Sequence, residues 1–215
     1  LALPPIAVVT LLWLPFGFSL HGLIEEWDVL GLFTTGGPIL FVKADDVVLA
    51  AHRLRPLTVL PHSLGFILDP DSFHAWHWLL IATLVAKGVA SSYIATHITR
   101  SQRWGVLFGL LILLYPADTM QLSFRSQHIN MSMALLLVGS ALLIHAQTQA
   151  AGLRRRLGVA IGSLSILAAQ MMYEVALMLC MLPLIVAWCR DGAATAWQSV
   201  RRNPSPTLGW PAPAV

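Results

Sequence analysis

The stretch WHWLLIATLVAKGVASSYIATHI, residues 76–98, decides the fold class of this chain. It contains Lys87 but no Arg, Asp or Glu, and a run of about 20 mainly apolar residues is what a helix needs to cross a membrane. The whole chain agrees, because 57% of its 215 residues are hydrophobic and 11% are charged, whereas soluble domains carry about 25% charged residues. The sequence therefore predicts an integral membrane protein.

Five further apolar segments have the character of membrane spans. They cover residues 3–24, 101–117, 128–146, 157–173 and 174–189. The last two form one apolar run that is interrupted around residues 170–174. A single helix over both would exceed the bilayer thickness, so we expect a tight hairpin. The predicted fold is an all-α, multi-pass transmembrane bundle of about six spans. Its core covers residues 1–190, and residues 191–215 form a cytoplasmic, disordered tail.

Lys and Arg in the short loops predict the orientation, since they accumulate on the cytoplasmic side. Of the 13 basic residues, those that follow the second, fourth and sixth spans are Arg100, Arg103, Arg154, Arg155, Arg156, Arg190, Arg201 and Arg202. One helix over residues 157–189 would move the last three outside, so the charges also favour the hairpin. Because the basic residues flank apolar runs and form no stripe, we expect no nucleic-acid partner.

The acidic residues separate the other way. Of the 10 acidic residues only Asp191 falls inside; the others are Glu25, Glu26, Asp28, Asp45, Asp46, Asp69, Asp71, Asp118 and Glu174. Acidic residues have little influence on topology, so this bias has another cause. Ordinary solvated loops are one explanation, and an active site or cation site that faces outward is the other.

The long outer loop, residues 25–75, is too apolar for a flexible linker, and we expect it to carry interfacial helices. Residues 45–55 are predicted to form a short helix that Pro56 stops. Its apolar face would consist of Val47, Ala51 and Leu54.

Asp45 and Asp46 form a carboxylate pair at the start of this segment, and His52 lies on nearly the same side as Asp45. Neighbouring carboxylates titrate as a coupled pair, which suits a general base or a ligand for a divalent cation. The alternative is an acidic pair that merely stabilises a helix N-terminus.

Four other ionisable residues lie near or inside the spans. Asp118 follows Pro116 at the end of the third span, with Arg125 after it, and Glu174 lies in the apolar turn of the hairpin. Lys87 lies near the middle of the second span, beyond comfortable reach of either interface. Intramembrane charges mark either functional sites or structural charge pairs, and both readings remain open here.

The motifs together resemble a known class of enzymes. Asp45-Asp46 is followed by Arg55-Pro56-Leu57, Tyr115-Pro116-Ala117-Asp118 closes the third span, and Tyr173-Glu174 lies in a further outer turn. With the topology, this pattern resembles the GT-C class of membrane glycosyltransferases, and the first two motifs look like the "DD … RP" signature of bacterial relatives, among them serotype-converting glucosyltransferases. Such enzymes usually have more core spans, so we expect a fragment or a reduced relative.

The resemblance implies that a sugar passes from a polyprenyl-phosphate carrier to a glycan, lipid or protein acceptor at the outer face of a cell membrane, a bacterial inner membrane in particular. Asp45 or Asp46 would be the general base, and Arg55 would hold the leaving phosphate. Further substrate-binding candidates are His52, Asp118, Arg125, Glu174 and Lys87. No metal ligand is assigned, although Asp46 and Asp118 could hold Mg²⁺ or Mn²⁺.

Two other functions fit the same residues. A cation-coupled transporter or channel subunit would use the carboxylates to bind cations, with Lys87 on the path. Transporters often break their helices at the midplane, and the breaking residues Pro15 and Pro183 lie in non-corresponding places. A non-catalytic membrane scaffold is the third reading.

Overall fold

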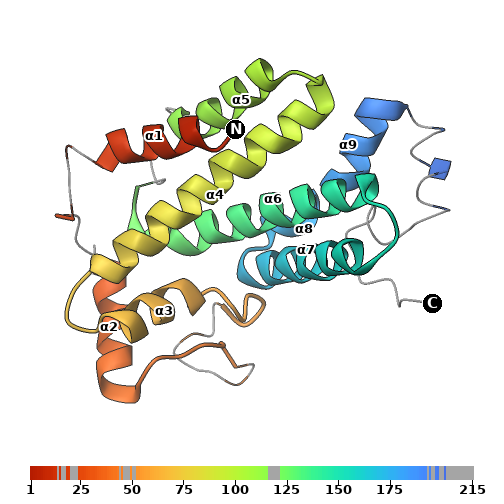
Figure 1. Cartoon of the computed structure of the whole chain (residues 1–215). Helices are drawn as coiled ribbons and strands as arrows, with labels where there is room; N and C mark the ends of the chain where they lie inside the picture. The colour runs from red at the N-terminus through yellow and green to blue at the C-terminus, as the bar shows by residue number, and fades with distance from the viewer. Residues whose placement is uncertain are drawn as a thin grey trace.

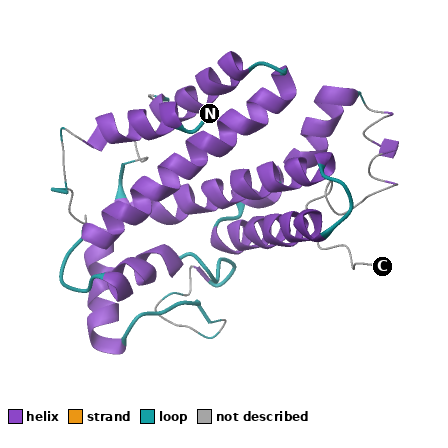
Figure 2. Cartoon of the chain, viewed as in Figure 1, coloured by secondary structure: helices purple, strands orange, loops and turns teal. Residues whose placement is uncertain are grey.

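The computed structural model describes residues 1–13, 15, 18–19, 24–43, 45, 49, 52–115, 122–192, 194, 197–198 and 201. Every regular element among these residues is a helix, and no strand occurs in them (Figure 2), which confirms the all-α class. The helices are α1 Leu3–Trp13, α2 Ile24–Gly36, α3 Leu60–Leu68, α4 His74–Thr99, α5 Gln102–Leu114, η2 Phe124–Ser126, α6 Gln127–Thr148, α7 Leu153–Met172, α8 Val175–Leu179 and α9 Leu182–Asp191.

Two helical segments are long and apolar enough to cross a membrane. They are His74–Thr99, which is α4, and Phe124–Thr148, which joins η2 to α6. These match the spans predicted at 76–98 and 128–146. At the other four predicted spans, the helices of the described residues are not both long and apolar enough to cross a membrane. The structure therefore supports two membrane-crossing helices, and the six-span bundle stays a prediction.

Prolines explain why the first and third predicted spans are short. α1 has 11 residues and ends at Trp13, and Pro15 is in a turn, because a proline cannot donate its amide and clashes with the carbonyl four residues earlier. α5 has 13 residues, and Tyr115 after it is extended, with φ −64° and ψ 113°. The residue before a proline disfavours the helical region, and Pro116 follows directly.

The C-terminal apolar run is broken twice. α7 has 20 residues and contains three arginines in its first turns, which lowers its apolar content. It ends at Met172, and the backbone of Tyr173 after it is extended, so the run is not one continuous helix and the predicted break is confirmed. α8 then has five residues and α9 ten. In one continuous helix the ring of Pro183 would clash with the carbonyl of Leu179, and α8 stops at Leu179.

The helices form a layer in which α4 and α6 lie side by side (Figure 1). They run in the same direction, whereas α5 on α4 and α7 on α6 run back. The N-terminal ends of α4 and α6 therefore share one end of the layer with α2, α3 and the α7–α8 corner, which we call the loop end. The opposite end, with the C-termini of α4, α6 and α9 and the start of α7, is the arginine end.

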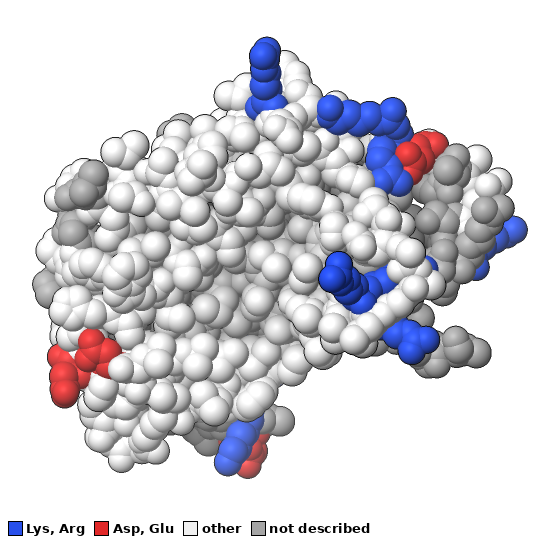
Figure 3. Space-filling model, viewed as in Figure 1, with Lys and Arg blue, Asp and Glu red and all other residues white. Residues whose placement is uncertain are grey.

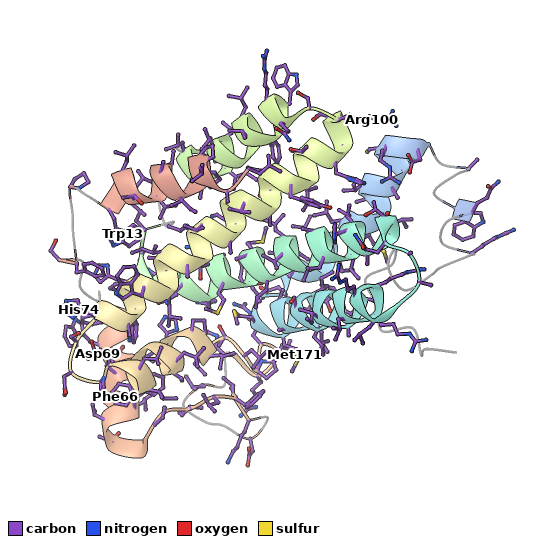
Figure 4. All side chains as sticks on the ribbon, in the orientation of Figure 1. Trp13, Phe66, Asp69, His74, Arg100 and Met171 are labelled. Carbon is purple, nitrogen blue, oxygen red and sulfur yellow. The ribbon has the colours of Figure 1, made fainter. Side chains whose placement is uncertain are left out.

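Charges are distributed unevenly between these ends. Figure 3 shows most Lys and Arg side chains around the arginine end, and acidic side chains mainly at the loop end. Arg100 lies at the far end of α4 from His74 (Figure 4). Arg190 of α9 contacts His97 near the end of α4, so the chain after Tyr173 does return to the arginine end, as the hairpin requires.

Glycines allow the helices to approach closely. A Cβ on Gly139 of α6 would lie 2.6 Å from the carbonyl oxygen of Gly162 in α7, and a Cβ on Gly109 of α5 would lie 2.0 Å from Oγ of Ser92 in α4. Small residues at such positions let helix backbones pack directly on one another, as they do in membrane bundles.

An aromatic cluster fixes α1 and η2 to the start of α4. Trp76 and Phe124 are buried with Trp13, whose Nε1 donates to Nδ1 of His77 over 3.1 Å. His77 is 0% exposed, so this histidine is a hydrogen-bonded core residue, as buried polar side chains usually are.

The loop 25–75 does carry helices, but not where the sequence places one. α2 and α3 lie on either side of the predicted segment 45–55. Within that segment the described residues form turns, with amides of His52 and Arg55 bonded to the carbonyls three residues earlier over 2.8 Å. The amide of Val42 donates to the carbonyl of Pro56 over 2.9 Å, which holds these two residues together. Leu54 is 94% exposed.

The predicted tail is mostly outside the described residues. Positions 194, 197, 198 and 201 are helical, and positions 202–215 are not described.

Candidate functional site

An ion pair joins two segments that are far apart in the sequence. Nε of Arg55 lies 2.5 Å from Oε2 of Glu174, and the Arg55 guanidinium carbon lies 5.5 Å from the centre of the Tyr173 ring. The Arg55 side chain is 29% exposed and the Glu174 side chain is 56% exposed. Exposed ion pairs contribute little to stability, so this pair serves mainly to fix where the guanidinium lies.

Backbone contacts position this pair. The amide of Leu57 donates to the carbonyl of Met171 over 3.0 Å, which ties the loop to the last turn of α7. Figure 4 shows Met171 beside the loop. Pro56 leaves Arg55 outside a helix, and the extended Tyr173 turns Glu174 toward it. The two motifs Arg55-Pro56 and Tyr173-Glu174 are therefore brought together by the Leu57–Met171 hydrogen bond and by the extended backbone at Tyr173.

A cavity of about 210 Å³ opens next to this pair. Its lining residues come from α2, the loop, α3, η2 and α6, and they are Val29, Leu49, His52, Thr58, Val59, His62, Arg125 and His128. The His128 ring lies 6.1 Å from the Tyr173 ring and 6.1 Å from the His62 ring. The aromatic contacts thus connect the Arg55–Tyr173 contact with the cavity wall.

His52 contributes a buried nitrogen to this wall. Its Nδ1 makes no hydrogen bond within the part of the chain that the structure describes. Buried polar atoms nearly always have a partner, so such an atom is expected at a site that receives a ligand or ordered water. The backbone of His52 also supports Arg55, because its carbonyl accepts the Arg55 amide over 2.8 Å.

His62 is a second buried histidine in the wall. Its Nε2 lies 3.1 Å from the carbonyl oxygen of Phe124. Burial, followed by the neighbouring His128, lowers the pKa of His62 from 6.5 to about 4. The ring is therefore neutral near pH 7, and Nε2 is the nitrogen that donates to Phe124. Sequence reasoning missed His62, since a single histidine in LPHSLGFIL shows no spacing that signals a site.

The predicted site residues divide into three groups. His52, Arg55, Arg125 and Glu174 meet around the cavity and the ion pair. Asp45 is exposed in a turn and is not part of the cavity wall. Asp46 and Asp118 lie outside the described residues, so the expected base pair and the expected second acidic position stay predictions.

Lys87 is placed away from the cavity wall. It is 5% exposed within the α4–α6 contact, and its Nζ donates to Oδ1 of Asn130 over 3.1 Å. An amide oxygen supplies a hydrogen bond but no opposite charge, so this contact is not the charge pair that sequence reasoning weighed. Asn130 comes two residues after His128 in α6, so the two side chains lie on nearly opposite sides of the helix. A role for Lys87 in substrate binding stays a prediction.

The described residues contain no group of three or more His, Cys, Asp or Glu side chains that could hold a metal ion. Of the two candidates for Mg²⁺ or Mn²⁺, Asp46 and Asp118, neither is described.

The arrangement can bind an anion and handle protons. Arg55 and Arg125 supply positive charge, and the N-terminus of α6 adds its dipole. Neutral imidazoles can each donate and accept a proton. Comparisons of the chain with protein-family models, with curated proteins and with solved structures give no match.

Proposed function

We propose that this chain is the core of a multi-pass membrane glycosyltransferase, which moves a sugar from a polyprenyl-phosphate carrier to an acceptor hydroxyl at the loop end. The observation that carries the proposal is the Arg55–Glu174 pair, placed over Tyr173 and beside a polar cavity at the N-terminal ends of α4 and α6. Both helices have the length and composition of membrane spans, so a carrier with a lipid tail could reach this end from the bilayer.

Arg55 is suited to a leaving phosphate. Glu174 contacts Nε, and the two Nη atoms form the other edge of the guanidinium, which matches two phosphate oxygens in bidentate fashion. The Tyr173 ring supports the guanidinium plane from one side. Holding the cation in advance is effective, because preorganised charge stabilises the transition state without reorganisation during the reaction.

The proposed step is a single displacement with inversion. Asp45 or Asp46 accepts the proton of the acceptor hydroxyl, and the oxygen attacks the anomeric carbon. The bond from that carbon to the phosphate oxygen breaks, and polyprenyl phosphate leaves with the bonding electrons. Arg55 and Arg125 compensate the negative charge that develops on the phosphate. His52 would hydrogen-bond the sugar or the acceptor through its buried Nδ1.

A transfer assay tests the assignment. Membranes that contain the full chain are given a radiolabelled polyprenyl-phosphate sugar, and label in the acceptor fraction is measured for Asp45→Asn, Asp46→Asn and Arg55→Lys. Asp71→Asn is the matched control, an exposed carboxylate of the same loop. We expect one Asp variant to lose activity by about 10²–10⁴-fold, Arg55→Lys to lose about tenfold or more, and the control to keep its activity.

The outcomes separate the parts of the proposal. Full activity in both Asp variants removes the assigned base, and full activity in Arg55→Lys removes the phosphate role. A wild-type chain that neither binds nor turns over lipid-linked sugars, yet transports cations or assembles with other membrane proteins, would favour the transporter or scaffold readings.

A further inference from the structure

Two neighbouring cavities at the arginine end are not used by the proposed reaction. The first, of about 350 Å³, is lined by Leu1, Tyr93, Thr96, His97, Arg100 and Arg190. The second, of about 290 Å³, is a groove between α4 and α6 lined by Ala86, Val89, Ala90, Tyr93, Val138, Ala141, Leu142 and His145. Tyr93 lines both, so a chamber with arginine and histidine side chains in its wall continues into an apolar groove along two helices.

The chamber carries an excess of positive charge. Nε of Arg190 donates to Oδ2 of Asp191 over 2.7 Å, and Nη1 of Arg190 contacts Nε2 of His97. Asp191 therefore balances Arg190, and Arg100 remains as the surplus cation of the group. Other basic side chains gather around the same end (Figure 3), which raises the positive potential there.

The groove has the opposite character. Its walls are formed by small and aliphatic residues of α4 and α6, and the hydroxyl of Tyr93 and Nδ1 of His145 lie 3.1 Å apart where it meets the chamber. A single occupant that satisfies both cavities has an anionic head and a hydrocarbon chain. The groove follows the two helices that have the character of membrane spans, so its long axis lies where an acyl chain would lie.

We propose that the arginine end binds one anionic phospholipid, with its phosphate at Arg100 and Arg190 and an acyl chain in the α4–α6 groove. The inference rests on the proposed membrane location but not on the proposed sugar transfer. Basic pockets between membrane helices on the cytoplasmic side are a recurring way to bind anionic headgroups. Bound there, the lipid would join α4, α6 and α9 at the end opposite the reaction.

Native mass spectrometry of the full chain in neutral detergent tests this site. Phosphatidylglycerol and phosphatidylcholine with the same acyl chains are compared as probes. We expect phosphatidylglycerol to bind more tightly, and Arg100→Gln to weaken its binding by about fivefold, the effect of one basic residue near a headgroup. Arg103→Gln, an exposed arginine of the same end outside both cavities, is the matched control and should change little.

A second pair of variants tests the groove. Val89→Trp should fill it and weaken binding of phosphatidylglycerol, whereas Ile161→Trp, on an exposed face of α7, should not. The proposal is overturned if both lipids bind equally, if Arg100→Gln and Arg103→Gln have the same effect, or if Val89→Trp retains the lipid. Displacement by excess inorganic phosphate would show a phosphate site without lipid docking and would also overturn it. No sugar donor is present, so these results do not depend on the transferase proposal.

Discussion

The loop end and the arginine end of the bundle hold their charges in different ways. At the loop end, Arg55 pairs with Glu174 of a distant segment and rests on Tyr173. At the arginine end, Arg190 pairs with Asp191, its neighbour in the sequence. The first arrangement exists only when the loop has docked on α7, whereas the second needs no tertiary structure.

This difference indicates where the chain keeps a preorganised site. A guanidinium held by a remote carboxylate and a ring has its position specified by the fold, which catalysis requires. The arginine end has a surplus of charge beside an apolar groove, which suits a mobile lipid headgroup. Buried polar groups reinforce the contrast, because the wall at the loop end contains His52 and His62 while the groove wall at the other end is apolar.

The largest expected effect is on sugar transfer. Arg55→Ala removes the cation proposed to hold the leaving phosphate, and we expect transfer to fall by about 10²–10³-fold, the usual loss for one preorganised group. Arg103→Ala, which also removes an arginine but at the opposite end, should leave transfer unchanged. The rate is measured in membranes at saturating acceptor. Equal losses in the two variants would contradict a functional difference between the ends.

The next effect is a pH dependence of stability that comes from the loop end. Burial lowers the pKa of His62 to about 4, while in the unfolded chain it is about 6.5. Between pH 6.5 and 4, His62 is protonated in the unfolded state but neutral in the folded state. The free energy of unfolding therefore falls as the pH drops from 6.5 toward 4. The contribution at pH 4 is at most about 3 kcal/mol.

Thermal unfolding in detergent between pH 4 and 7.5 measures this effect. His62→Gln cannot titrate, so its melting temperature should depend less on pH than that of the wild type. His74→Gln removes a histidine that is 63% exposed and should leave the pH dependence as it is. A wild-type slope retained in His62→Gln would show that another group causes it.

The close packing of α6 on α7 gives a third effect, on the free energy of unfolding. A Cβ at Gly139 would lie 2.6 Å from a backbone oxygen of α7, whereas a Cβ at Gly158 would have its nearest neighbour at 3.6 Å. We expect Gly139→Ala to destabilise by about 1–3 kcal/mol through overpacking. Gly158→Ala should be neutral or stabilise by up to about 1 kcal/mol, because alanine favours the helix. Both are read from unfolding in the same detergent, and a tolerated Gly139→Ala would mean that α6 and α7 separate easily.

The sequence predicts best the parts of the fold that are decided locally. Apolar runs bounded by polar residues predict the ends of α4 and α6 to within two residues. The interruption of the apolar run around residues 170–174 predicts the break after α7. The described residues of the segment 45–55 do not form the α-helix that the sequence predicts there. The Val42 amide donates to the Pro56 carbonyl of the same loop, and the Leu57 amide donates to the Met171 carbonyl of α7. Such contacts leave no periodic pattern in the sequence.

The site was predictable in its members but not in its geometry. Arg55, His52, Arg125 and Glu174 stand out as charged or titratable residues beside apolar segments. Nothing in the sequence shows that Arg55 pairs with Glu174 or that His62 joins the wall, since both follow from the docking of the loop and α3 on α6 and α7. The roles of Asp45, Asp46 and Asp118 depend on the same docking and remain predictions.

The smallest effect compares the two ion pairs directly. A double-mutant cycle with Arg55→Ala and Glu174→Ala should give a coupling free energy of about 0.2–1 kcal/mol in the free energy of unfolding, as expected for a partly exposed pair. The cycle with Arg190→Ala and Asp191→Ala should give less, although its side chains are only 23% and 25% exposed. Neighbouring residues can also pair in the unfolded chain, and an interaction present in both states cancels. A larger coupling for the second pair would mean that the arginine end depends on its charges for tertiary structure, and the contrast between the ends would then fail.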